Sequence, residues 1–188
     1  KRSKLMGRVF QDPMAGTAPS MTVEENLALA YSRNKRRTLG LGVTRKRREL
    51  FREALSSLNL GLENRLNAKI GLLSGGERQA ISLLMATFTE PDILLLDEHT
   101  AALDPNRAQL ITNLTKDIVQ KYGLTTLMVT HNMQQALDLG NRLIMMDGGQ
   151  IILDIDEGLK KQLTVDDLLN EFQRIRGEKL ASDRTLLA

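Results

Sequence analysis

The chain contains no cysteine and no tryptophan among its 188 residues, and only 3% of the residues are aromatic. The absence of cysteine excludes disulfide bonds and metal sites built from thiolates. The scarcity of aromatic side chains argues against the stacking platforms that bind single-stranded nucleic acid. No apolar run approaches the roughly 18 residues that a membrane-spanning helix needs. What remains is the composition of an ordinary globular protein, with 41% apolar and 26% charged residues.

The charge is unevenly distributed along the chain, although the net charge is only +3. Eight lysine and arginine residues, and no acidic residue, lie between Arg33 and Arg48. Such a basic run can form a patch for nucleic acid or anionic lipid headgroups, but it is more often a solvated loop and helix start. Because no aromatic side chain is interleaved with these cations, we expect no nucleic-acid partner.

The sequence pattern changes after the first half of the chain. Residues 11–90 predict a mostly helical lobe, in which Thr22 and Glu25 have the spacing of a capping box. A second helix is expected from about Thr44 to Leu58. After Pro91, short apolar runs alternate with helical patterns, which predicts a parallel sheet covered on both faces, with an antiparallel pair at one edge. The expected elements there are a strand over 93–97, a helix over 105–122, a strand over 124–130, a short helix over 133–139, a hairpin over 142–154 and a last helix over 164–176, followed by a tail without periodicity beyond Gly177.

Two carboxylates close the first of these strands. Asp97 and Glu98 follow the apolar run Ile93–Leu96, which predicts a strand buried on both faces. Ligands of open α/β sheets bind at the carboxyl ends of the strands, so Asp97 is placed to hold Mg²⁺, directly or through water, against phosphate oxygens. Glu98 can orient and deprotonate a water molecule. A pair of solvated acids at a strand exit is the alternative interpretation.

The second element that carries chemistry is Leu73–Gln79, which reads Leu-Ser-Gly-Gly-Glu-Arg-Gln. A helix is expected to begin near Gly76 or Glu77, directly after Ser74. Free backbone N–H groups and the positive end of the helix dipole can bind an anion there. Gly75 and Gly76 let a phosphate approach without interference from a Cβ atom. Alone, a serine N-cap followed by glycines would be an ordinary helix start.

The Ser-Gly-Gly helix start and the strand that ends in two carboxylates together resemble the ATP-binding subunits of ABC transporters, over nearly the whole chain. The resemblance implies an α/β fold: a partial P-loop NTPase (ABC ATPase) core with a parallel sheet, plus a helical subdomain. It divides the chain into residues 1–90 (Q-loop, helical subdomain and signature helix), 91–158 (second part of the core) and 159–188 (C-terminal helix and tail). No G-x-x-x-x-G-K-[ST] phosphate loop occurs in the sequence. We therefore expect an N-terminally truncated chain that alone binds ATP weakly or not at all.

The resemblance also implies ATP and Mg²⁺ as cofactors and gives roles to individual residues. Gln11 matches the Q-loop, where an amide can ligate Mg²⁺ or the attacking water. His131 resembles the switch histidine that contacts the γ-phosphate. In the family, the signature segment binds the ATP held by the opposite subunit, and Asp104 matches a D-loop that reaches across the dimer. The expected catalytic residues are Glu98, His131 and Gln11, the expected metal ligands are Asp97 and Gln11, and the expected nucleotide contacts are Ser74, Gly75, Gly76, Gln79 and Asp104.

Partners follow from the same resemblance. They are transmembrane permease subunits, a second ATP-binding subunit in a head-to-tail dimer and, indirectly, a solute-binding protein. The implied location is cytoplasmic, peripheral on the inner face of the plasma membrane. Residues 21–27, 97–104 and 141–146 are similar to cassettes paired with tryptophan/tyrosine-type solute-binding proteins. At His99, where many cassettes have proline, we expect no catalytic role.

Two alternatives keep the cassette but change its use. A degenerate cassette would be a non-hydrolysing dimerisation or docking module, and the sequence upstream of Lys1 would discriminate it from an ATPase. A soluble ATPase that is not part of a transporter would act on chromosomes or ribosomes. The chromosome type inserts a long coiled coil between the lobes, whereas only 63 positions separate Gln11 from Ser74. The ribosome type carries two cassettes, and this chain has one set of motifs.

Overall fold

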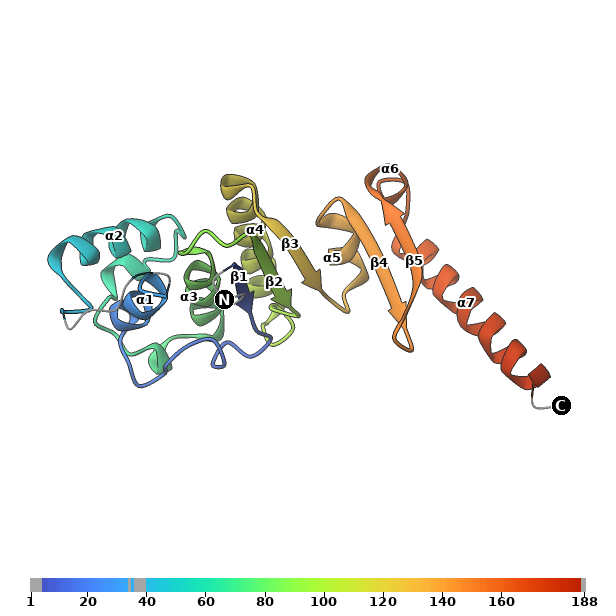
Figure 1. The fold of residues 1–188 in the computed structure, drawn as a ribbon, viewed down its shortest axis with the longest axis horizontal. Coiled ribbons are helices and arrows are strands. Elements are labelled where there is room, and N and C mark those ends of the chain that lie inside the picture. Colours follow the sequence, from blue (N-terminus) through green and yellow to red (C-terminus); the bar gives the residue numbers. More distant parts are fainter. Residues whose placement is uncertain (1–4, 34, 36–39, 187–188) are drawn as a thin grey trace. The chain divides into compact units, whose positions relative to one another are not determined.

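The computed structural model describes residues 5–33, 35 and 40–186 of the chain (Figure 1). It divides into two compact units, Lys1–Val129 and Thr130–Ala188. Residues within each unit contact one another far more than they contact the other unit. The three segments expected from the sequence instead group residues by the motif to which they belong. In the described part of the chain, no helix is both long enough and apolar enough to cross a membrane.

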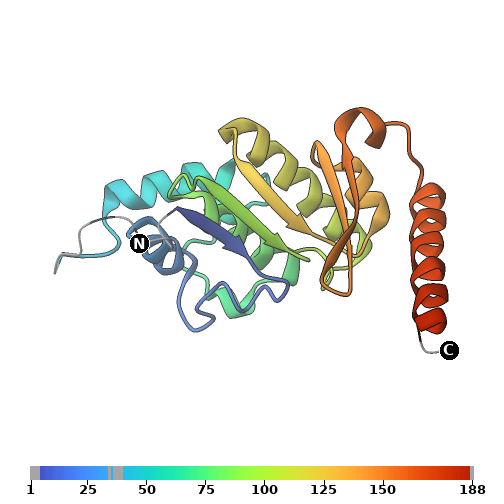
Figure 2. The ribbon, with the colours of Figure 1, turned by 45° about the vertical axis from the view of Figure 1, so that its right-hand side comes forward.

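A three-stranded parallel sheet forms the centre of the first unit. Its strands β1 (Met6–Val9), β2 (Ile93–Asp97) and β3 (Thr125–Val129) lie in that order, with β2 in the middle. Figure 2 shows the three strands running side by side in the same direction. Val9 pairs with Leu96 in the register of the sheet. The carboxyl ends of the strands therefore meet at one edge, as the sequence predicts.

One face of this sheet is buried under two helices. The helices are α3 (Gly75–Thr87) and α4 (Pro105–Tyr122), and α4 has the bounds expected from the sequence. Alternate strand residues, such as Leu94 and Leu96, are buried in one cluster with residues of both helices, including Leu83 of α3 and Ile111 of α4. Gly7 of β1 lies so close to α3 that an added Cβ would come within 2.5 Å of the Ala86 carbonyl oxygen.

The other face of the sheet is less buried, so the expectation that β2 is buried on both faces is wrong. Ile93 and Leu95 are only half-buried, and Leu127 and Val129 of β3 are 55% and 52% exposed. The physical reason is that both helices, α3 and α4, pack against the face of the sheet that carries Leu94 and Leu96. In the described residues, burial therefore alternates along β2 with the pleat of the strand.

The helical lobe predicted between the first two strands is confirmed. Thr22 and Glu25 form the capping box: the Glu25 amide donates to Thr22 Oγ1 at 3.3 Å, and the Thr22 amide donates to Glu25 Oε2 at 2.7 Å. Phe51 and Leu55 are fully buried, whereas Leu50 is 38% exposed. The elements of the lobe are α1 (Val23–Tyr31), α2 (Arg45–Ser56) and the short 3₁₀ turns η2 (Leu62–Asn64) and η3 (Ile70–Leu72).

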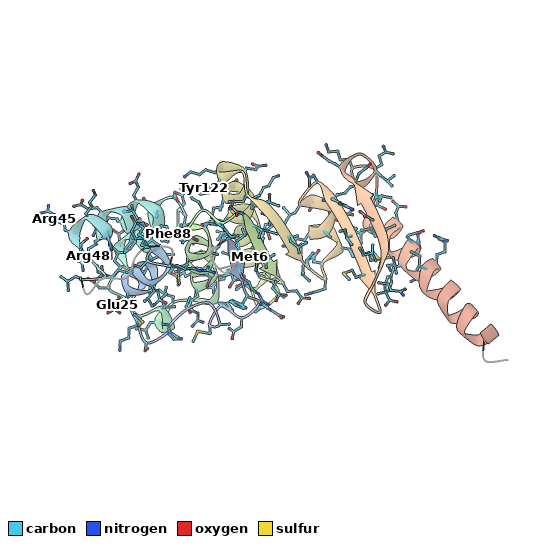
Figure 3. The ribbon with its side chains drawn as sticks, in the orientation of Figure 1. Met6, Glu25, Arg45, Arg48, Phe88 and Tyr122 are labelled. Atoms are coloured by element: carbon cyan, nitrogen blue, oxygen red, sulfur yellow. The ribbon has the colours of Figure 1, made fainter. Side chains whose placement is uncertain are left out.

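The basic run between Arg33 and Arg48 is described only in part, because residues 34 and 36–39 lie outside the described residues. Figure 3 shows Arg45 and Arg48 on α2. The guanidinium of Arg48 donates to both carboxylate oxygens of Glu24, at 2.6 and 2.7 Å. These contacts support the interpretation of the run as a helix start.

The second unit contains an antiparallel hairpin of β4 (Arg142–Asp147) and β5 (Gln150–Asp156). Gly148 and Gly149 both have positive φ, which confirms the predicted turn. The two strands form a separate two-stranded sheet, so the expectation of an antiparallel pair on the edge of the parallel sheet is wrong. The expectation of an irregular tail beyond Gly177 is also wrong, because the helix α7 runs over Val165–Leu186. The short helices α5 (Met133–Asp138) and α6 (Glu157–Lys160) complete the unit.

Candidate functional site

The predicted carboxylates lie at the carboxyl edge of the parallel sheet. Asp97 is the last residue of β2, and Gln11 follows the end of β1 by two residues. The Glu98 amide donates to the Val129 carbonyl at 2.9 Å, which extends the pairing of β2 with β3 by one residue. The topology therefore brings Gln11, Asp97 and Glu98 to the same edge of the sheet, as ligand sites of open α/β sheets require.

Asp97 has an ion-pair partner that the sequence reasoning missed. Arg8 Nη2 lies 2.7 Å from Asp97 Oδ2, and the two side chains are 52% and 45% exposed. Arg8 pairs with Leu95 in the sheet, so Arg8 and Asp97 lie on the same face of neighbouring strands. The signal was present as a cation one residue before the end of β1, but only the strand register shows that it lies beside Asp97.

Glu98 has an unusual backbone conformation. Its φ is +43°, a left-handed conformation that costs a non-glycine residue on the order of 1 kcal/mol. The Ala101 amide donates to the Glu98 carbonyl at 2.9 Å and closes a turn directly after the strand. Asp97 therefore belongs to the regular strand, whereas Glu98 belongs to the turn, which gives the two neighbouring carboxylates different backbone settings.

The Ser74–Gly76 segment forms the start of α3, one residue earlier than expected. Ser74 is the N-cap: its Oγ accepts from the Glu77 amide at 3.3 Å, and its own amide donates to Glu77 Oε2 at 2.7 Å. Arg65 Nη1 lies 2.7 Å from the other oxygen of Glu77. Partial burial alone would raise the pKa of Glu77, but the Ser74 hydrogen bonds, with the charges of Arg65 and Arg107, outweigh it and lower that pKa.

The two glycines of this helix start have a packing role that the sequence did not indicate. A Cβ on Gly75 would come within 3.3 Å of the Leu103 side chain, and a Cβ on Gly76 within 3.2 Å of Arg107 Cδ. Asp104 is the N-cap of α4: its Oδ1 accepts from the Arg107 amide at 3.1 Å, and its Oδ2 lies 3.3 Å from Arg107 Nε. The helix start of α3 thus lies against the first turn of α4, and Arg107 is a cation at this place that the sequence reasoning missed.

Gln79 lies inside the protein. Its side chain is fully buried, and Gln79 Nε2 donates to the Phe10 carbonyl at 3.0 Å. Gln79 therefore fixes the backbone directly before Gln11 to helix α3. Gln79 Oε1 is also buried and has no hydrogen-bond partner among the described residues. A direct contact between Gln79 and a nucleotide stays a prediction.

The two histidines have different settings. His99 is 1% exposed, its Nε2 lies 3.0 Å from Thr115 Oγ1, and burial lowers its pKa to about 4. Such a buried, neutral side chain contributes to packing, and its expected lack of a catalytic role stays a prediction. His131 is exposed and belongs to the second unit. Its action together with Glu98 stays a prediction.

The donor set at the sheet edge fits Mg²⁺, which prefers oxygen ligands and is usually held by one or two carboxylates plus water and phosphate. Asp97, half-buried at the end of a strand, and the exposed amide of Gln11 supply such oxygens. Over the described ranges, histidine, aspartate and glutamate side chains do not gather in groups of three that could hold a metal. One carboxylate and one amide leave most positions around Mg²⁺ to other oxygens, such as those of water or a phosphate.

Comparisons with known proteins show which proteins the chain resembles. A family model described as "ABC transporter" matches residues 1–101. The tyrosine transport ATP-binding protein of Clostridioides difficile (strain R20291) is 46% identical over 173 residues, which cover 92% of this chain and 68% of that protein. The methionine import ATP-binding protein MetN of Streptococcus pneumoniae (strain ATCC BAA-255 / R6) is 35% identical over 166 residues, covering 86% of this chain and 44% of that protein.

A solved structure shares the fold. It is a dimeric ATP-binding cassette in a post-hydrolysis state, bound to ADP and Pi, with a TM-score of 0.66 and 30% identity. The match covers 81% of this chain and 62% of that one. The matched part of the chain thus spans between 44% and 68% of the length of these three proteins.

Proposed function

Because the chain belongs to the ABC transporter family of ATP-binding proteins, we propose that the protein binds ATP with Mg²⁺ and hydrolyses it to drive a solute across a membrane. The observation that carries this proposal is the meeting of Gln11, Asp97 and Glu98 at the carboxyl edge of the parallel sheet. The relatives named above are transport and import ATP-binding proteins, which supports this function over the docking module and over the soluble ATPase.

In this proposal the residues of the sheet edge have separate tasks. Asp97 holds Mg²⁺, which neutralises charge on the β- and γ-phosphates. Glu98 accepts the proton of the water that attacks the γ-phosphate, and Gln11 helps to orient that water through its amide. His131 donates a hydrogen bond to the γ-phosphate. The turn at Glu98 supports its separate task, because it gives this carboxylate a backbone setting different from that of Asp97 in the strand.

The start of α3 serves a second subunit in this proposal. Gly75 and Gly76 bind the phosphates of an ATP molecule held by the partner through the backbone N–H groups of the helix start, and Ser74 contributes its hydroxyl. Asp104, at the start of the neighbouring helix α4, reaches the same dimer interface. The short distances from these glycines to the first turn of α4 support a common role, because they make the two helix starts one surface. Gln79 contributes by fixing the loop that carries Gln11.

The substrate and partners are proposed from the relatives. The most similar of the two, at 46% identity, is named for tyrosine transport, which supports an amino-acid substrate of that type. Two transmembrane permease subunits would bind a pair of ATP-binding subunits on the inner face of the membrane, and a solute-binding protein would deliver the substrate. The specificity itself would reside in the permease and the solute-binding protein.

The test begins with the coding sequence in frame upstream of the Lys1 codon. A G-x-x-x-x-G-K-[ST] there would supply the phosphate cradle on which hydrolysis depends, and an open reading frame without one would favour the docking module. In the protein encoded by the whole reading frame, Glu98→Gln is expected to lower kcat for ATP roughly 100- to 10,000-fold, because a general base contributes about that much.

The same variant should still bind ATP and should stay dimeric for longer, because only the chemical step is removed. The matched control is Glu90→Gln, which alters an exposed glutamate with a similar left-handed φ of +47° and should leave turnover unchanged. Normal steady-state hydrolysis by Glu98→Gln would remove Glu98 from the mechanism.

A further inference from the structure

The carboxylate assigned to Mg²⁺ already has a cation beside it. Arg8 Nη2 lies 2.7 Å from Asp97 Oδ2, which is the distance of a charge-assisted hydrogen bond. Both residues face the same side of the sheet from neighbouring strands. One of the two Asp97 oxygens is therefore occupied by a side chain of the chain itself.

Arg8 is fixed in this position by its surroundings. Its Cζ atom lies 4.5 Å from the centre of the Phe10 ring, a cation–π distance that restricts the guanidinium. The Phe10 backbone is fixed in turn by the hydrogen bond from Gln79 Nε2. The position of Arg8 therefore depends on the same segment that carries Gln11 into the site.

We propose that Arg8 is the counter-ion of Asp97, and that a divalent cation must displace it before binding both oxygens of that carboxylate. This inference rests on the proposed function, because it takes Asp97 as the metal ligand. A guanidinium and a metal ion cannot share Oδ2, since the two like charges would lie within a few ångströms of each other. Arg8 thereby raises the cation concentration at which the site fills.

The competition is weak enough to be overcome. Both side chains of the pair are about half exposed, and exposed ion pairs of this kind are screened by water and salt. Removing the Arg8 charge is therefore expected to strengthen cation binding about two- to fivefold. A displaced Arg8 keeps its charge at the sheet edge, next to the place where phosphate is proposed to bind.

The test measures Mn²⁺ binding directly and does not depend on ATP turnover. Mn²⁺ is titrated into the 188-residue chain, and the free ion is quantified from its electron paramagnetic resonance signal. The variants are Arg8→Met, which keeps the apolar stem without the charge, and Arg8→Gln as a second neutral variant. Asp97→Asn tests the ligand itself. The matched control is Arg142→Met, which removes an arginine that pairs with Asp154 at 2.6 Å in the second unit.

The expected result is a two- to fivefold lower Mn²⁺ dissociation constant for both neutral Arg8 variants and an unchanged constant for Arg142→Met. Asp97→Asn should lose this binding, both in the parent chain and when it is combined with an Arg8 variant. Unchanged or weaker binding by the Arg8 variants, or no measurable binding by them at millimolar Mn²⁺, would overturn the inference about Arg8. If Asp97→Asn binds Mn²⁺ as well as the parent chain does, then Asp97 is not the ligand. In that case the proposed function loses its metal residue together with the inference.

Discussion

His99 gives the folded chain a pH-dependent stability that can be worked out from its surroundings. The ring is buried, and its Nε2 lies 3.0 Å from Thr115 Oγ1. The Thr115 hydroxyl donates its single proton to the Ile111 carbonyl at 2.7 Å, so its oxygen must accept from His99. His99 therefore carries a proton on Nε2, and the ring is neutral at pH 7 because burial lowers its pKa to about 4.

The magnitude follows from the difference between the two states of the chain. Burial lowers the pKa of His99 to about 4 in the fold, against about 6.5 in the unfolded chain. Between these two values the unfolded chain binds a proton that the folded chain does not, so stability falls as the pH falls. From pH 7 to pH 5 this loss amounts to about 2 kcal/mol. Above about pH 7 the contribution of His99 is fully present and no longer depends on pH.

The assay is urea denaturation, followed by circular dichroism, at several pH values between 7 and 5. His99→Gln, whose amide can still donate to Thr115, should lose about 2 kcal/mol less than the parent chain over this range. His131→Gln, measured in the same way, separates the contribution of the only other histidine of the sequence from that of His99. An equal pH dependence in the parent chain and in His99→Gln would refute the reasoning, as would a His99 ring that titrates near pH 6.5 by NMR.

Two further predictions concern helix α3. Glu77→Ala should cost about 1 kcal/mol of unfolding free energy at pH 7, because it removes half of the capping box. Since the fold lowers the pKa of Glu77, this contribution is present above its ordinary value near 4.5 and is lost as the pH falls through the lower folded value; equal costs at pH 7 and pH 3.5 would contradict it. Gln79→Leu leaves the Phe10 carbonyl without its donor, at a cost of about 1–2 kcal/mol. It should also speed proteolysis of residues 11–20, and an unchanged cleavage rate would show that Gln79 does not fix this loop.

The parts of the fold that the sequence predicts well depend on residues close together in the chain. The capping box of Thr22 and Glu25 spans one helical turn, and the structure reproduces both of its hydrogen bonds. The N-cap at Ser74 and the glycine turn over Gly148 and Gly149 are equally local. At such positions the backbone conformation follows from a few neighbouring side chains, so the pattern is sufficient.

The parts that the sequence did not predict depend on partners far away in the chain. Four apolar residues in a row do not reveal that Leu94 is buried while Leu95 is only half-buried, because this depends on where α3 and α4 pack. The roles of Gly75 and Gly76 in packing likewise depend on the first turn of another helix. For the candidate site, the sequence predicted the carboxylates at the sheet edge, and the family resemblance added Gln11. Neither Arg8 nor Arg107 was predicted.

The Arg8–Asp97 pair shows why such omissions concern function more than fold. Its members are 89 positions apart, and only the register of β1 against β2 brings them together. Removing this exposed pair would change the stability of the fold by about 1 kcal/mol or less. The same pair nevertheless occupies the carboxylate assigned to Mg²⁺, and Phe10 connects it to Gln79 on the signature helix. A contact that contributes little to folding can therefore still decide when the site accepts its cation.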